Sequence, residues 1–480
     1  MNKNLTISIL LGALISLCCM TAMAARRVVP KRYIYRYTLR DKQGSHYRLD
    51  TPQRWLSRKS IDRRRRQHLS LDSTDLPVSS HYLRQFVLPH KEAEASHTAI
   101  VGTSRWLNTV LVRSEDTLLL QRLARLSCVL HATCVWTSPD STERPVLHKL
   151  HEQLNRWDSI RGSRYGHGRE QIAQLNGQRL HGLKLRGHGM TIAVLDGGFQ
   201  NVDRIPAFRN VSIEEVCDIV SIAKDEPTPP GFRPRIYTDT DHGTKVLSVM
   251  ALDQEEVFTG TAPDAAYWLF RCEDQESEQE VEEDYWVMAA EKADSAGVDI
   301  INSSLGYNEF DNPRQNHRLY QLDGNTTIIS QAASMLARKG IILVNSAGNT
   351  GMGPWKKICV PADAHEILTV GAITAEKRCA PFAAVGPTQD GRIKPDVVAL
   401  GAPAALISGA GIVTHDMGTS FSTPVVCGLV ACLWQAFPKK SAIDIINLVR
   451  KTADNYKTPD NVYGFGVPNF WKAYMIGKLE

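Results

Sequence analysis

The segment Gly-Thr-Ser-Phe-Ser-Thr-Pro at residues 418–424 places Ser420 directly before an apolar run at 425–434. The apolar run predicts a buried helix, and Pro424 is a residue that helices accept in their first turn. We therefore expect Ser420 at a helix N-terminus, where free N–H groups and the helix dipole favour developing negative charge. A nucleophilic serine needs this environment, because its attack on a carbonyl group creates an oxyanion. Taken alone, the segment is more typical of an ordinary loop.

His242 and Asp196 could supply the base and the carboxylate that such a serine requires. His242 precedes an apolar helical pattern at 246–252, and Asp196 follows a strand-like apolar run at 190–195. A hydroxyl is a poor nucleophile at neutral pH until a base accepts its proton, and a carboxylate then orients the histidine. A single histidine is usually structural, but here each of the three roles has a residue. The pattern predicts acyl transfer through Asp196, His242 and Ser420.

From about residue 165 onward, short buried strands alternate with helices. The expected strands are 190–195, 298–302 and 341–345, and the expected helices are 285–295 and 327–339. Strands that are buried on both faces and separated by helices predict a parallel α/β sheet. Because polar side chains at the carboxyl ends of such strands meet at one edge, Asp196, Ser304 and Asn349 should lie close together.

This part of the chain, from about residue 165 to the C-terminus, resembles the subtilisin-like serine peptidases (the subtilase family, peptidase S8). Matching motifs surround Asp196, His242 and Ser420 in the chain order of a subtilisin-type triad. Residues 346–349 resemble the loop that holds the family's oxyanion asparagine, and residues 302–306 resemble the strand that pairs with the substrate. The resemblance implies a subtilisin-like parallel sheet flanked by helices and a serine-type endopeptidase (EC 3.4.21.-).

The resemblance also assigns roles to residues beside the triad. It implies that Asn349 contributes to the oxyanion hole. The substrate-binding residues that it implies are Ser304, Leu305, Gly306 and Gly348.

Some positions depart from the family's pattern without removing a triad residue. Gly197 stands where the family often has a hydroxyl residue, and Phe421-Ser422 stands where it often has Met-Ala. The usual calcium-site loops are not recognisable near Asp203 or Asp253, and no Cys/His cluster has metal-ligand spacing. We therefore expect no metal site and no cofactor, with calcium unsupported by a clear site.

Residues 1–24 have the features of a secretory signal peptide. Lys3 precedes an apolar stretch, and residues 22–24 (Ala-Met-Ala) form a small-x-small cleavage pattern. A lipoprotein signal is disfavoured because Leu17 precedes Cys18. We expect export to the periplasm, the cell surface or the exterior, with no stable membrane anchor.

The rest of the chain divides by charge. Residues 25–165 carry 26 Lys and Arg against 13 Asp and Glu, whereas residues 166–480 carry 29 against 38. Arg63 to Arg66 alone could indicate nucleic-acid binding, but an acidic partner in the same chain favours mutual attraction, so we expect no nucleic-acid partner. We predict a basic domain at 25–160 and a catalytic domain at 161–480.

The basic domain has the pattern of a small α+β (ferredoxin-like) fold, with helices packed against one face of a sheet. The expected strands are 33–39, 106–112 and 129–136, and the expected helical pieces are 55–67, 76–88 and 115–126. Its position resembles that of the inhibitory propeptide that often precedes subtilase domains. The resemblance therefore implies a zymogen, with protein or peptide substrates and its own propeptide as an intramolecular inhibitor.

The sequence leaves two other functions to consider, and its acidic segment at 273–284 has two interpretations. The chain could be an inactive subtilase-fold binding scaffold, although the complete triad argues against it. An α/β-hydrolase esterase would need Gly-x-Ser-x-Gly and the order Ser, Asp, His, which this chain lacks. The eight carboxylates within 273–284 either favour basic side chains in a substrate or form a solvated loop that stabilises the next helix start.

Overall fold

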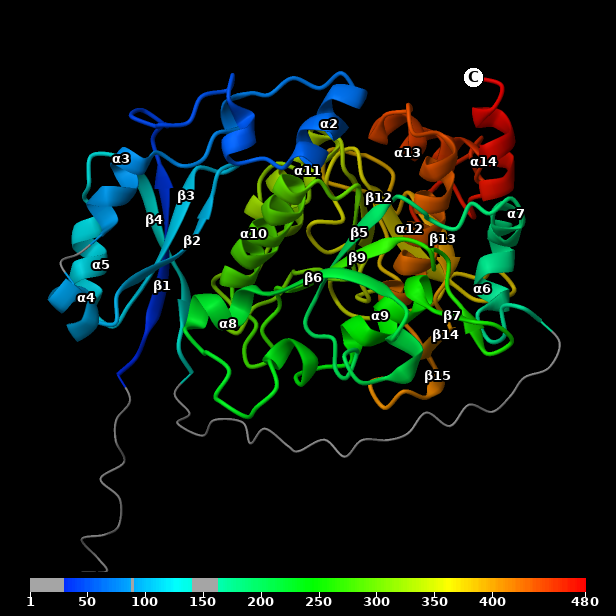
Figure 1. Cartoon of the computed structure of the whole chain (residues 1–480), viewed down its shortest axis with the longest axis horizontal. Helices are drawn as coiled ribbons and strands as arrows, with labels where there is room; N and C mark the ends of the chain where they lie inside the picture. Colours follow the sequence, from blue (N-terminus) through cyan, green and yellow to red (C-terminus); the bar gives the residue numbers. More distant parts are fainter. Residues whose placement is uncertain (1–29, 88–89, 140–162) are drawn as a thin grey trace, which may run out of the picture.

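The computed structural model describes residues 30–87, 90–139 and 163–480, which form two units lying side by side (Figure 1). The first unit is built on a four-stranded sheet and the second on a seven-stranded sheet. The predicted signal peptide at 1–24 and most of the segment between the two units lie outside the described residues.

The first unit has a βαββαβ order, which is the ferredoxin-like arrangement expected, although only three of its strands were predicted. Its elements are β1 (Tyr33–Leu39), α2 (Arg58–Arg66), α3 (Ser80–Leu83), α4 (His90–Ala95), β2 (Ala99–Ser104), β3 (Thr109–Ser114), α5 (Thr117–Leu123) and β4 (Val129–Thr137). The sheet order is β2-β3-β1-β4, with all neighbours antiparallel. The predicted strands and helices are present, although α3 is only one turn of the helical piece expected at 76–88. The sequence pattern did not predict β2 or α4.

The two faces of this sheet pack against different partners. Tyr37, Val110 and Val112 point to one side, in a core shared with α5. Ile34 and Trp136 point to the other side, in a core shared with α8 (Ile219–Lys224) and α10 (Val281–Ala296) of the second unit. Residues of α3 and α5 therefore cover one face, as predicted, and the second unit covers the other, whereas α2 lies against α10 of the second unit.

The second unit contains the remaining elements. In addition to α8 and α10 they are α6 (Arg169–Gln174), α7 (Gly177–Gly182), β5 (Thr191–Asp196), β6 (Ser212–Asp218), α9 (His242–Ala251), β7 (Asp253–Gln254), β8 (Phe258–Thr259), β9 (Ala266–Arg271), β10 (Ile300–Ser303), α11 (Ile328–Met335), β11 (Ile342–Ser346), β12 (Leu368–Ile373), β13 (Val397–Leu400), β14 (Ala404–Ile407), β15 (Val413–Asp416), α12 (Thr419–Ala436), α13 (Ala442–Lys451) and α14 (Phe470–Gly477). The large sheet has the order β13-β12-β11-β10-β5-β9-β6, and every neighbouring pair is parallel. The predicted parallel sheet flanked by helices is confirmed.

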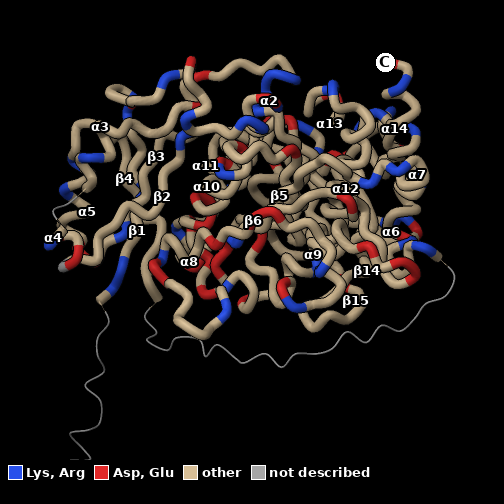
Figure 2. The backbone as a smooth tube through the Cα atoms, viewed as in Figure 1, with Lys and Arg blue, Asp and Glu red and all other residues tan. Residues whose placement is uncertain are grey.

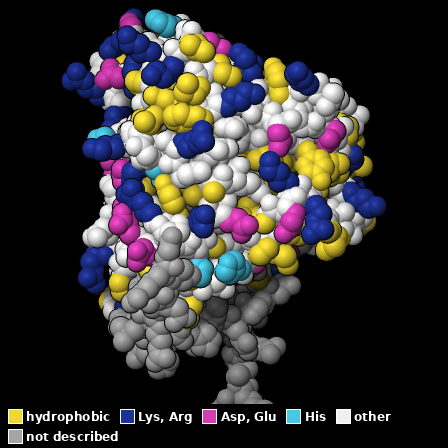
Figure 3. Space-filling view, turned by 90° about the vertical axis from the view of Figure 1, so that its right-hand side faces the viewer, with side chains coloured by type: hydrophobic (Ala, Val, Ile, Leu, Met, Phe, Trp, Pro, Cys, Tyr) yellow, Lys and Arg dark blue, Asp and Glu magenta, His cyan; other side chains and the backbone are white. Residues whose placement is uncertain are grey.

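Successive residues of the central strands enter different cores. On β5, Ile192 and Val194 pack with α9, α12 and α13, whereas Ala193 and Leu195 pack with α8, α10 and α11. Burial on both faces explains why this strand appears in the sequence as a continuous apolar run. Figure 2 shows acidic residues along α10, next to the first unit. Figure 3 shows the face of the second unit that points away from the first unit. Charged and hydrophobic side chains alternate there in small patches, as expected for a surface in water.

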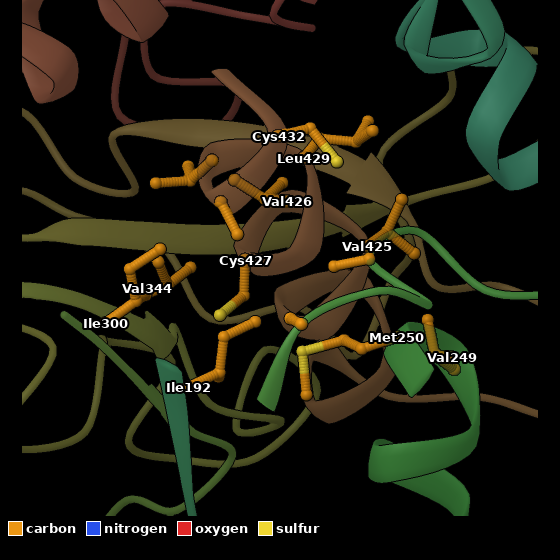
Figure 4. Close-up of a cluster of buried hydrophobic side chains, with 14 of the residues drawn as sticks. Ile192, Val249, Met250, Ile300, Val344, Val425, Val426, Cys427, Leu429 and Cys432 are labelled. Carbon is orange, nitrogen blue, oxygen red and sulfur yellow. The ribbon is translucent and has the colours of Figure 1, made fainter. Parts of the chain in front are cut away.

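Helix α12 lies in the centre of the second unit. Its 18 residues are long and apolar enough to span a membrane by composition, but 89% of the helix is buried inside the protein. Val425, Val426 and Cys427 pack among the side chains of β5, β10 and α9 (Figure 4). Burial within the fold accounts for the hydropathy of α12, as in the core helix of a soluble domain.

The structure corrects the expected position of Pro424. The residue is not in the first turn of α12, because the helix begins at Thr419 and includes Pro424 in its interior. Proline has no N–H, so the carbonyl of Ser420, four residues earlier, has no helical donor. The hydroxyl of Ser304, which directly follows β10, donates to this carbonyl at 2.9 Å. Because of the proline, the Ser420 carbonyl can accept from Ser304, and this hydrogen bond links the start of α12 to the end of β10.

This arrangement predicts a coupled pair of substitutions. In a Ser420→Ala background, which retains the carbonyl, Ser304→Ala should destabilise the fold by about 1–3 kcal/mol by leaving a buried acceptor unpaired. Adding Pro424→Ala supplies an N–H four residues after the carbonyl, so the double substitution should cost less than the sum of the two single ones. The midpoints of denaturant unfolding of the four proteins measure the coupling. Additive losses would show that the restored N–H does not replace the Ser304 hydroxyl, and no loss in Ser304→Ala would show that the contact contributes nothing.

Candidate active site

The predicted site residues meet at the carboxyl edge of the parallel sheet. Asp196 ends β5, Ser304 follows the end of β10, and Asn349 lies three residues beyond β11. These three strands are direct neighbours in the sheet. His242 and Ser420 come from the N-terminal turns of α9 and α12, so all five residues converge from separate elements.

Asp196 and His242 form a close ion pair. The side chain of Asp196 is fully buried, and its Oδ1 and Oδ2 lie 2.9 and 3.0 Å from Nδ1 of His242. A carboxylate can only accept, so Nδ1 donates and Nε2 is the nitrogen left to exchange a proton. Burial opposes the charged imidazolium, but the charge of Asp196 and this hydrogen bond outweigh burial and raise the pKa of His242 to about 9.

Ser420 lies near the start of α12 but is turned away from His242. Its Oγ donates to the carbonyl oxygen of Ser304 at 3.2 Å, in exchange for the hydrogen bond that the Ser304 hydroxyl donates to the Ser420 carbonyl. Among the described residues no hydrogen bond joins Ser420 to His242. Both side chains line the same cleft, and catalytic hydrogen bonds are often long or misaligned when no substrate is bound.

Asn349 is oriented by Thr419, the residue before the serine. Its Oδ1 accepts from the backbone N–H and from the hydroxyl of Thr419, both at 3.0 Å. Because a backbone N–H can only donate, the atom facing it is the amide oxygen, and Nδ2 is directed the other way. The hydroxyl of Thr419 also accepts from the N–H of Gly348 at 3.2 Å. The sequence pattern assigned no role to Thr419, and its only signal was a hydroxyl residue beside the serine.

A cleft of about 830 Å³ runs past these residues. It is lined by His242, Ser420, Asn349, Ser304, Leu305, Gly306 and Gly348, which are all the predicted site residues except the buried Asp196. Gly348 has a φ of +108°, and a Cβ there would lie 2.8 Å from Sγ of Cys359, so this wall requires glycine. The cleft is also lined by residues to which the sequence pattern assigned no individual role: Glu273, Glu278, Asp311 and Cys359.

Asp203 and Asp253, near which the sequence shows no recognisable calcium-site loop, each pair with an arginine. Arg233 pairs with Asp203, and Arg186 pairs with Asp253 at 2.5 Å. A bound guanidinium replaces the positive charge that a calcium ion would supply there. The arginines therefore do not fit a calcium site at either carboxylate, and the expectation of no cofactor stays a prediction.

Comparison with known proteins agrees with this geometry. The model of the subtilase family (Peptidase_S8) matches residues 187–466, and the model described as the peptidase S8 propeptide domain of Bacteroidota matches residues 35–148. Both matches fall inside the domains predicted at 161–480 and 25–160, whose boundaries themselves stay predictions.

Individual relatives match 45% to 64% of the chain. Subtilisin DY from Bacillus licheniformis is 30% identical over 216 residues, which are 45% of this chain and 70% of the relative. Serine protease AprX from Bacillus subtilis (strain 168) is 27% identical over 323 residues, covering 60% of this chain and 67% of the relative. A crystal structure of MycP1 without its N-terminal propeptide aligns with a TM-score of 0.49 at 23% identity, covering 64% of this chain and 96% of that one. Since the subtilase model matches more than half of the sequence, the chain belongs to the subtilase family of serine peptidases (peptidase S8) and carries an S8 propeptide domain ahead of its peptidase domain.

Proposed function

We propose that this chain is an exported serine endopeptidase that is synthesised as a zymogen and cleaves peptide bonds with Asp196, His242 and Ser420. The observation that carries the proposal is the hydrogen-bonded Asp196–His242 pair at the cleft that Ser420 also lines. Family membership supports the reaction class, and the propeptide match supports the zymogen. Export rests on the signal peptide pattern at 1–24 alone.

In the proposed reaction Ser420 leaves the carbonyl of Ser304 and turns its hydroxyl towards Nε2 of His242. His242 takes the hydroxyl proton as Oγ attacks the scissile carbonyl, and it later returns this proton to the leaving amine. The buried Asp196 holds the ring in the required tautomer and stabilises the imidazolium through Nδ1. Water then releases the acyl group by the same proton transfers in reverse order.

The negative oxygen formed in this attack needs donors that are already in place. The N–H of Ser420 lies in the first turn of α12, where backbone N–H groups have no partner within the helix. We assign the second donor to Nδ2 of Asn349, because Thr419 already binds the opposite end of that amide. Two fixed donors stabilise the oxyanion without reorganisation at the moment of reaction.

The raised pKa of His242 predicts an alkaline enzyme. His242 acts as a base only when it is neutral, so activity should be lost as pH falls below its pKa and should rise as pH increases towards about 9. The acid limb of kcat/KM against pH, measured on the mature enzyme, should therefore lie well above the ordinary histidine value of 6.5. Asp196→Asn should lower kcat by about 10⁴ and move this limb to lower pH. A wild-type limb at 6.5 would contradict the charge coupling.

The propeptide is held to the peptidase domain by a buried ionic network. The carboxylate of Asp294, near the C-terminal end of α10, is fully buried and pairs with Arg63, Arg64 and Arg105 of the propeptide. Arg63 also donates to the carbonyls of Val298 and Lys339, at 2.5 and 3.1 Å. The arginine run at 63–66 thus contributes Arg63 and Arg64 to this network, and Arg66 also pairs with Asp299 at 3.7 Å, which supports the mutual attraction expected from the charge split.

Arg63 and Arg65 provide a matched test of this interface. They are two residues apart on α2, but Arg63 is fully buried against Asp294, whereas Arg65 is 75% exposed and contacts Asp62 of its own helix. Breaking a buried ion pair costs about 3–5 kcal/mol. Propeptide carrying Arg63→Gln, added to mature enzyme, should therefore inhibit about 10²–10³-fold more weakly than wild type. Arg65→Gln should change the inhibition constant less than about threefold. Equal effects would show that total charge, and not the buried pair, holds the propeptide.

The whole proposal can be tested through maturation. Wild-type protein, purified after export, should yield a fragment that begins within residues 139–165, because this polar, turn-rich sequence joins the two units. Ser420→Ala should remain a precursor from about Ala25, since losing the nucleophile lowers kcat by about 10⁶ in a subtilisin. Intact mass measurement decides between these outcomes. Normal processing of Ser420→Ala in a protease-deficient host would rule out self-cleavage.

The chief alternative is a binding scaffold that has lost catalysis. A fluorophosphonate probe reacts only with an activated serine, so it should label mature wild type and leave Ser420→Ala unlabelled. Absence of labelling in both proteins would favour the scaffold and contradict the peptidase.

A further inference from the structure

The eight carboxylates at 273–284 fall into two groups. Five of them have cationic partners: Lys224 binds Asp274 and Glu276, Arg36 binds Glu280 and Asp284, and His317 binds Glu283. The other three, Glu273, Glu278 and Glu282, contact no cation within the described residues. The segment is therefore largely buried and paired, and the expectation of a solvated loop is wrong for most of it.

The three unpaired residues form a cluster. One carboxylate oxygen from each lies within 4.8 Å of the other two. Burial, together with the neighbouring carboxylates, raises the pKa of Glu273 to about 7, that of Glu278 to about 8, and that of Glu282 well above its ordinary value. Like charges in a poorly solvated site oppose one another's ionisation, and a cation placed among them would relieve this repulsion.

Two buried polar atoms beside the cluster have no partner. Glu282 is completely buried, and while its Oε1 accepts from the N–H of Asp274 at 3.2 Å, its Oε2 has no hydrogen-bond partner in the described structure. The hydroxyl of Tyr307 is also buried and unpaired, and the charges of Glu282, Glu273 and Glu278 act on it. Buried polar atoms are normally satisfied, so these two indicate that a ligand completes the site.

The cluster opens into the proposed active-site cleft. Glu273 and Glu278 line it together with His242 and Ser420. Glu273 lies so close to the triad that a Cβ added to Gly197, the residue after Asp196, would be 2.6 Å from its Oε2. A peptide cleaved at Ser420 must pass this point, where a basic side chain would meet the unpaired carboxylates.

The same segment already binds an arginine from another part of the chain. Arg36 of the propeptide reaches Asp284 at 2.9 Å and also pairs with Glu280. This contact shows that carboxylates of the segment accept a guanidinium presented on an extended strand, since Arg36 lies on β1. It favours a side-chain cation over a metal ion for the remaining three carboxylates.

We propose that Glu273, Glu278 and Glu282 form a subsite that binds a lysine or arginine side chain of the substrate close to the scissile bond. The inference rests on the proposed function, because it requires a peptide in the cleft. It assigns the substrate class as peptides with a basic residue near the cleaved bond, recognised by charge and by the unfilled hydrogen-bonding capacity of Glu282 and Tyr307.

Paired peptides test the proposal on the mature wild-type enzyme. The peptides of each pair are identical except for Lys or Gln at one position, and the pairs scan the positions around the scissile bond. At one position kcat/KM for the Lys peptide should exceed that for the Gln peptide by about tenfold or more. A ratio near one at every position overturns the subsite. No Ser420-dependent cleavage of any peptide would instead overturn the proposed function.

Two matched variants connect the preference to the cluster. Glu278→Gln should reduce the Lys/Gln ratio about tenfold, because it removes one charge from the site. Glu309→Gln removes the same charge from an exposed neighbouring position outside the cluster and should leave the ratio within about twofold. An unchanged ratio in Glu278→Gln would contradict the assignment.

The metal dependence of activity distinguishes a bound metal ion from a substrate side chain as the cation at the cluster. The wild-type ratio should be the same in EDTA and in excess calcium. If EDTA abolished activity or folding, and calcium restored it in wild type but not in Glu278→Gln, the cluster would be a metal site and the proposal would be wrong.

Discussion

The burial of helix α12 is the constraint on which the candidate site depends. The helix runs through the apolar core, and near its middle a Cβ on Gly428 would lie 2.0 Å from the hydroxyl oxygen of Thr261, so only glycine allows this close approach, and the Thr261 hydroxyl donates to the Pro424 carbonyl at 3.3 Å. Its start is fixed as well, because Ser304 and Ser420 exchange hydrogen bonds between side chain and backbone. A side chain held by such packing keeps its position to within the tolerance that catalysis requires.

Carboxylates of the peptidase domain fall into three groups according to their partners. Some pair within their own domain, some pair with the propeptide, and some have no cationic partner. Asp196 is paired within its own domain by His242. Asp294 and Asp284 are paired across the interface by propeptide arginines, so they lose these counter-ions when the propeptide leaves. Within the described residues Glu273 and Glu278 form no salt bridge even with the propeptide in place, although the charge of His242 acts on Glu273. The proposed removal of the propeptide would therefore leave a peptidase domain of net negative charge, with carboxylates that have lost their arginine partners, which is consistent with the cationic substrates proposed above.

Several features were predictable from the sequence because local patterns determine them. The apolar run at 190–195 became β5, since burial on both faces leaves a continuous signal, and Asp196 at its end followed directly. The edge strand β2 was missed because it is half-buried and carries Gly102, whose missing side chain leaves space for Met288 of α10. The position of Pro424 was misjudged because the helix start depends on contacts with distant strands and not on proline preference. The exchange between Ser304 and Ser420, which are 116 residues apart, leaves no local pattern.

The acidic segment at 273–284 was also only partly predictable from the sequence. Sequence alone could not separate carboxylates that have a cationic partner from those that have none, since both kinds alternate within a few residues and both line the cleft. The structure links this segment to Gly197, which departs from the hydroxyl residue often found there in the family. A Cβ at position 197 would lie 2.6 Å from Oε2 of Glu273 and 2.6 Å from Nε2 of Gln275. Any side chain at 197 would therefore require the flexible ends of Glu273 and Gln275 to shift, so Gly197 suits the position that Glu273 takes in the cleft wall. Departures from a family's local pattern beside an otherwise complete triad are expected where the cleft is adapted to its substrate.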